Sequence, residues 1–124
     1  MKITSFNPLI VTAHPEDLIK FFEELGFERR HTKEGIGING IDNSVFRLKN
    51  ANGFSLDIVH NGTLPSDLTG IRINVDDFDE AYKLFKAQGF EEYVNDGTIN
   101  TASSKFVLLK SPSGFIINLI QHKK

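Results

Sequence analysis

The 124-residue sequence contains no cysteine and no tryptophan, and it has little net charge. Without cysteine it cannot form disulfides, thiolate nucleophiles or thiolate metal sites. A formal net charge of −2 provides no basic surface for a phosphate backbone, so we expect no nucleic-acid partner. No apolar run approaches the roughly 20 residues that cross a bilayer. The N-terminal MKITSFNPLIV is too short and too polar for a signal peptide. We therefore expect a cytoplasmic protein with no membrane partner.

Two segments of the chain repeat each other. Gly70–Glu91 has a partial copy earlier in the sequence, at Asn7–Glu28, and both end in the tripeptide Gly-Phe-Glu. A second pair of similar segments consists of GFSLDIV at Gly53–Val59 and GFIINLI at Gly114–Ile120. Because both pairs of similar segments occur in the same order and with nearly the same spacing, the chain is predicted to contain two copies of one structural unit.

The first copy is predicted to form a strand, a helix and three further strands. The β-branched and apolar residues in Ile3–Thr12 favour a strand. Pro15 fits the first position of a helix, where its missing N–H does no harm, and Gly26 fits a left-handed helix end. Ser44–Lys49 and Phe54–Val59 should form a hairpin, because the residues between them favour a turn.

The second copy is predicted to follow the same order. Ile71, Ile73 and Val75 alternate with Arg72 and Asn74, as expected for a strand with one apolar face. Acidic residues then suit the start of a helix, which should end at the next Gly-Phe pair. Further strands follow, and the last two should close the copy as a hairpin.

Together these patterns predict an α+β fold of two βαβββ modules in tandem, within a single domain spanning residues 1–124. Module one covers about residues 1–60, a polar linker covers 61–69, and module two covers about 70–124. Four strands are predicted between the two helices. A ferredoxin-like βαββαβ chain, the structural alternative, would have only two there.

Three segments resemble motifs of the vicinal oxygen chelate superfamily in order and spacing. They are DLIKFFEELGF at Asp17–Phe27, INVDDFDEAYKLFKAQGF at Ile73–Phe90 and SPSGFIINLIQ at Ser111–Gln121. This superfamily includes glyoxalase, fosfomycin- and bleomycin-resistance proteins and extradiol dioxygenases. The resemblance implies a curled mixed sheet with an open cleft, and a homodimer, since such proteins commonly pair. It does not specify a reaction, because the family hosts unrelated chemistries on one scaffold.

In metal-dependent members, the resemblance implies ligands at the opening of each module and in each closing strand. Those positions here are Asn7, Asp57, Gly70 and Asn118. Only Asp57 is a good ligand for a divalent cation, whereas zinc, iron and nickel sites need imidazoles or several carboxylates. His60 should not help, because three residues along a strand place it on the opposite face from Asp57. We expect no metal and no cofactor, as in the metal-free bleomycin-resistance branch.

The same resemblance implies that the sheet faces turned away from the helices line the cleft. Strand alternation then predicts the polar ligand-binding residues. These are Asn7, Asp57, Arg72, Asn74 and Asn118. A few polar groups in a mainly apolar cleft are typical of a site for a small organic molecule.

The turn between the last two strands decides which residues of the penultimate strand join this set. If that turn consists of the four residues Ser111–Gly114, Val107 and Leu109 face the cleft as well.

Arg72 and Asp57 have two interpretations of equal weight. In the first, the planar fork of Arg72 holds an anionic or carbonyl-bearing ligand, and Asp57 and Asn118 fix its polar groups. In the second, Arg72 and Asp57 pair and fill the space of a lost metal, since an unpaired charge there would be costly. The two are compatible, because a ligand could break the pair.

The predicted function is therefore that of a glyoxalase- and bleomycin-resistance-like protein that lacks metal ligands and binds a small organic molecule. The alternative is a lyase or dioxygenase-type enzyme of the same superfamily, with an atypical or absent metal. An arginine neighbour would weaken Asp57 as a general base, which favours binding over catalysis.

Overall fold

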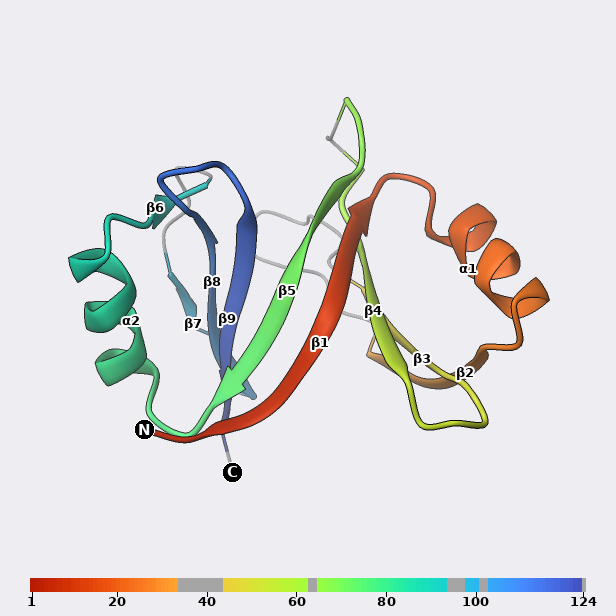
Figure 1. Cartoon of the computed structure of the whole chain (residues 1–124), viewed down its shortest axis with the longest axis horizontal. Helices are drawn as coiled ribbons and strands as arrows, with labels where there is room; N and C mark the ends of the chain where they lie inside the picture. Colours follow the sequence, from red (N-terminus) through yellow and green to blue (C-terminus); the bar gives the residue numbers. More distant parts are fainter. Residues whose placement is uncertain (34–43, 63–64, 94–97, 101–102, 124) are drawn as a thin grey trace. The chain divides into compact units, whose positions relative to one another are not determined.

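A computed structural model describes residues 1–33, 44–62, 65–93, 98–100 and 103–123, and Figure 1 shows its helices and strands. The first elements in chain order are β1 (Ile3–Thr12), α1 (Pro15–Glu24), β2 (Glu28–Lys33), β3 (Val45–Lys49) and β4 (Ser55–His60). They are followed by β5 (Leu68–Val75), α2 (Phe78–Ala87), β6 (Glu91–Glu92), β7 (Ile99–Asn100), β8 (Ser104–Lys110) and β9 (Ile116–His122).

This order confirms the predicted α+β class and the repeated strand–helix–strands module. The described residues between α1 and α2 form β2, β3, β4 and β5, as predicted. The ferredoxin-like alternative is therefore wrong. Within the described residues, neither helix has the length and apolar character needed to cross a membrane.

The chain divides into two compact units. The first unit contains residues 8–69, and the second contains residues 1–7 together with 70–124. Strand β1 contributes to both, because its first residues belong with the second copy of the repeat. The backbone N–H of Asp76 donates to the Lys2 carbonyl at 3.1 Å, and the Lys2 N–H donates to Asp76 Oδ1 at 2.6 Å.

In the first unit the strand order is β2-β3-β4-β1. β2, β3 and β4 are antiparallel neighbours, and β1 lies parallel to β4. Helix α1 buries Ile19 completely against one face of these strands. The buried residues of this core are Ile19, Phe46, Leu48, Leu56 and Ile58. Alternation along β4 thus places Leu56 and Ile58 toward the helix.

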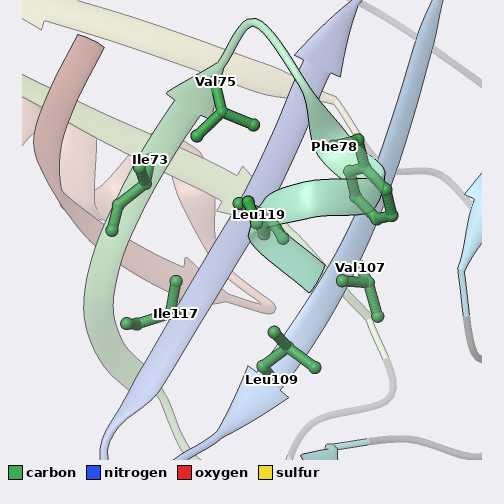
Figure 2. Close-up of a cluster of buried hydrophobic side chains, with 8 residues drawn as sticks. Ile73, Val75, Phe78, Val107, Leu109, Ile117 and Leu119 are labelled. Carbon is green, nitrogen blue, oxygen red and sulfur yellow. The ribbon is translucent and has the colours of Figure 1, made fainter. Parts of the chain in front are cut away.

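In the second unit the order is β5-β9-β8-β6, with β7 also paired to β8. β5 and β9 are parallel, whereas β8 and β9 are antiparallel. Ile73 and Val75 pack in one apolar cluster with side chains of β8, β9 and α2, as predicted (Figure 2). The buried residues of this cluster are Ile73, Val75, Phe78, Ala81, Val107, Leu109, Ile117 and Leu119.

Local hydrogen bonds fix the start of α2. The carboxylate of Asp77 caps the helix by accepting from the Glu80 N–H at 3.1 Å. Gln121 on β9 binds the same turn twice. Its Oε1 accepts from the Phe78 N–H at 2.7 Å, and its Nε2 donates to the Asp76 carbonyl at 2.9 Å. Gln121 therefore connects the last strand to the helix that covers it.

The β8–β9 turn differs from the sequence prediction. Lys110 pairs with Ile116, so five residues rather than four connect the strands. The Ser111 hydroxyl stabilises this wider turn by accepting from the backbone N–H of Gly114 and of Phe115, both at 3.0 Å. A shift of one residue moves every side chain of β8 to the other face of the sheet.

Val107 and Leu109 consequently point toward α2 and belong to the apolar cluster in Figure 2. The prediction that they face the cleft is wrong. Leu108, directly across from Asn118, shares the face on which they were expected.

Candidate ligand-binding face

The second unit has a polar group of side chains on the sheet face that points away from α2. We call this surface of β5 and β9 the inner face. Arg72 and Asn74 alternate with the core residues of β5, so they lie on it. Arg72 is paired in register with Asn118, and Asn74 with Ile120. Although polar, Arg72 and Asn74 are each only 6% exposed.

Asn74 is anchored by a residue from the start of the chain. Its Nδ2 donates to the Ser5 Oγ at 2.5 Å, and both residues belong to the second unit. Its Oδ1 is buried and has no hydrogen-bond partner among the described residues. Sequence reasoning did not identify Ser5, because nothing in the local pattern of β1 indicates which distant side chain it meets.

Asn118 lies in the middle of the inner face and is half-buried. Its Nδ2 donates to the Val107 carbonyl at 3.3 Å, so the side chain leans toward β8. Its neighbours in register are Leu108 on β8 and Arg72 on β5. Asn7 is also half-buried and belongs to the second unit. Strand alternation places it on the same side of β1 as Ser5.

Asp57 lies in the first unit and is completely buried. Its carboxylate accepts two hydrogen bonds from Arg47 on β3: Nε to Oδ1 at 2.9 Å and Nη2 to Oδ2 at 3.3 Å. The hydrogen bond to Asp57 raises the pKa of Arg47, although burial opposes this. Arg47 and Asp57 are exact register partners in the β3–β4 hairpin.

Sequence reasoning missed Arg47. The expected four-residue turn at residues 50–53 would place Arg47 opposite Leu56. In the structure five residues, 50–54, connect β3 and β4, and this register pairs Arg47 with Asp57. The structure thus assigns four of the five predicted residues to the second unit and Asp57 to the first.

Gly70 is one of the positions at which the family resemblance implied a metal ligand. At Gly70 a Cβ atom would overlap the backbone carbonyl oxygen of Ile116, so no side chain fits there without a shift of β9. The described residues contain no group of three His, Cys, Asp or Glu side chains that could hold a metal ion.

The two copies place different residues at equivalent positions. In the first unit, Leu9 pairs with Asp57, and Val11 pairs with Val59. These pairs are equivalent to the inner-face pairs of β5 and β9 in the second unit. Leu9 therefore corresponds to Arg72, and Val11 to Asn74. Across the hairpins, Arg47 beside Asp57 corresponds to Leu108 beside Asn118. Arg47 and Arg72 therefore lie on equivalent faces of the two units, but on strands that do not correspond.

No family model and no curated protein matches the sequence of this chain, whereas solved structures match its fold. A methylmalonyl-CoA epimerase from Mycobacterium tuberculosis is 14% identical with a TM-score of 0.65, over 98% of this chain and 90% of that one. A Streptomyces coelicolor methylmalonyl-CoA epimerase in complex with 2-nitronate-propionyl-CoA is 15% identical with a TM-score of 0.64, over 99% and 100%.

A glyoxalase I mutant from Zea mays is also similar, at 14% identity and a TM-score of 0.66. The match covers 97% of this chain but only 43% of that one. At such identities these likenesses show a common fold.

Proposed function

We propose that this chain, which has the fold of the vicinal oxygen chelate superfamily, binds a small organic carboxylate or carbonyl compound without a metal. In this respect it would resemble the bleomycin-resistance branch. The observation that supports the proposal most directly is the nearly buried Arg72 on the inner face, beside the neutral Asn118.

The chemistry of Arg72 suits this role. A guanidinium presents several N–H donors in a planar fork, which matches the two oxygens of a carboxylate. Ile116 and Ile120 lie on the same face of β9 and are each only 4% exposed. Apolar surroundings with a few fixed polar groups are what a small-molecule site requires.

Absence of a resident metal is proposed from the residues at the ligand positions. Gly70 has no room for a side chain, and Asn7 and Asn118 offer only neutral amide groups. One carboxylate, Asp57, already accepts two hydrogen bonds from Arg47. Such a set does not match the ligands that zinc, iron or nickel prefer.

The alternative is a lyase or dioxygenase-type enzyme with an atypical or absent metal. It is favoured by the enzymes among the similar structures, which include methylmalonyl-CoA epimerase and glyoxalase I. Asp57 is the obvious acid–base candidate. Both of its oxygens are engaged by Arg47, and it is fully buried, so it is poorly placed to take a proton from a substrate.

A melting-temperature screen tests the proposal, because ligands that bind the native state stabilise it. The panel contains zinc, nickel, manganese, aromatic carboxylates and neutral aromatic compounds. We expect carboxylates to raise Tm of the wild type, and Arg72→Ala to remove that increase. Arg30 is an exposed arginine that pairs with Glu28, so Arg30→Ala serves as the control and should retain the increase. Increases with the metals alone, or an unchanged response of Arg72→Ala, would contradict the proposal.

Two further proposals concern the assembly and its location. We propose a homodimer in the cytoplasm. Large apolar side chains that remain exposed support self-association: Phe6 is 59% exposed, Leu25 60% and Phe54 66%. Light scattering of the purified protein measures the molar mass, and a monomer at all concentrations would contradict the dimer.

A further inference from the structure

Asn74 contains a polar atom that the fold leaves unsatisfied. The residue is 6% exposed, and its Oδ1 has no hydrogen-bond partner among the residues that the structure describes. A buried acceptor without a hydrogen bond is unfavourable compared with an apolar group of similar shape. The presence of a carboxamide at this position therefore needs a reason.

The first unit shows that the fold does not require a polar residue here. Val11 occupies the equivalent position, paired in register with β4 as Asn74 is paired with β9. Val11 is 4% exposed, so an apolar side chain is buried at the same place in the same kind of module. Asn74 thus departs from the pattern of the repeat.

Ser5 adds a second polar group beside it. The Ser5 Oγ accepts from Asn74 Nδ2, so the serine hydroxyl proton remains able to donate to another atom. Asn74 Oδ1 remains able to accept. A donor and an acceptor side by side match an alcohol, whose oxygen accepts and whose proton donates.

We propose that Ser5 and Asn74 form a hydroxyl subsite, so that the ligand is a hydroxyl-bearing organic carboxylate. Arg72 and Asn74 are alternate residues of β5 on one face, with Cα atoms about 7 Å apart. One small molecule can therefore present its carboxylate to Arg72 and its hydroxyl to Asn74. This inference rests on the proposed function, in which Arg72 binds the acid.

Two probes that differ by a single hydroxyl group test the subsite. Mandelate and phenylacetate are titrated calorimetrically into the wild type, Ser5→Ala and Asn74→Val, the last of which installs the residue of the first unit. We expect the wild type to bind mandelate about fivefold more tightly than phenylacetate. Both variants should lose this preference, because their affinity for mandelate falls toward that for phenylacetate.

The outcomes separate the subsite from the proposed function. Equal wild-type affinity for the two probes would overturn the hydroxyl subsite and leave carboxylate binding intact. Arg72→Ala should weaken the binding of both acids. If the wild type binds neither acid, the subsite and the proposed carboxylate site are both overturned.

Stability without any probe gives a second readout. If Asn74 serves a ligand, Asn74→Val removes an unsatisfied acceptor and should raise Tm by about 3 °C. If Asn74 instead serves to hold Ser5 and β1 in place, the same variant should melt at a lower temperature. A lower Tm would overturn the inference that the carboxamide is retained for a ligand.

Discussion

Arg47 lies directly across the β3–β4 ladder from Asp57 and donates two hydrogen bonds to its fully buried carboxylate. The arginine side chain is 34% exposed, so one end of this ion pair reaches solvent while the other does not. The equivalent pair of the second unit is Leu108 and Asn118, which contains no charge. The two copies thus fill the same place with an ion pair in one case and a neutral pair in the other.

This relationship predicts strong coupling between Arg47 and Asp57. Arg47→Leu should lower the free energy of unfolding by about 3 kcal/mol, because the buried carboxylate loses its two hydrogen bonds. Adding Asp57→Asn should restore most of that loss, since the double variant copies the pair at Leu108 and Asn118. Urea unfolding of both single variants and the double variant measures the coupling. A double variant no more stable than Arg47→Leu would contradict this prediction.

The converse exchange in the second unit should affect binding. Asn118→Asp places a carboxylate next to Arg72 in register, where it competes with an acidic ligand for the guanidinium. We expect affinity for phenylacetate to fall about tenfold or more, which corresponds to about 1.4 kcal/mol. Asn118→Leu, which adds no charge, serves as the control in the same titration. Equal effects of the two substitutions would show that charge is not the cause.

The close approach of β5 to β9 predicts that Gly70 cannot be replaced. Even alanine would place its Cβ against the Ile116 carbonyl, so Gly70→Ala should cost about 2 kcal/mol or more through backbone displacement. Gly62→Ala is the matched control, since its nearest neighbour would be the His60 ring at 3.8 Å, an ordinary contact. Thermal unfolding compares the two, and equal Tm values would argue against the close approach.

Gln121 should matter more than an ordinary strand-end residue. Gln121→Leu removes both hydrogen bonds to the turn before α2 and should destabilise the protein by about 1–2 kcal/mol. Gln121→Glu retains an acceptor for the Phe78 N–H and loses the donor to the Asp76 carbonyl, so an intermediate effect is expected. Urea unfolding ranks the variants. If leucine is tolerated as well as glutamine, the bridge does not contribute to stability.

The pair of Lys105 and Asp79 should make stability depend on acid pH. The hydrogen bond from Lys105 lowers the pKa of Asp79 in the folded protein. A lowered folded pKa gives stabilisation that is complete above the ordinary carboxyl pKa, near 4, and disappears as pH falls through the folded value. Lys105→Met keeps the side-chain stem near Phe78 and removes the charge.

The difference in Tm between the wild type and Lys105→Met should therefore be larger at neutral pH than in acid. The same difference at both pH values would show that the ion pair is not responsible. Because Asp79 is exposed, we expect the effect to be small and to decrease with added salt.

The orientation of strand residues could be predicted where alternation alone decides it. Ile73 and Val75 occur where the sequence placed them, as do Arg72 and Asn74, because the strand has one core face and its period is two. The repeat likewise predicted the order of helices and strands. Both features depend on short segments whose pattern is complete within a few residues.

Contacts that depend on register could not be predicted in the same way. The turn at residues 111–115 is one residue longer than expected, and this was enough to reverse Val107 and Leu109. The partner of Asp57 likewise depended on hairpin register. The contact between Ser5 and Asn74 joins distant segments, and no local periodicity indicates it.

The sharing of β1 between the two units has a consequence for synthesis on the ribosome. Lys2 is translated well before its hydrogen-bonding partner Asp76. Such long sequence separations delay the closure of native contacts. The start of β1 therefore cannot reach its final position until the ribosome has added the 74 residues that lead from Lys2 to Asp76.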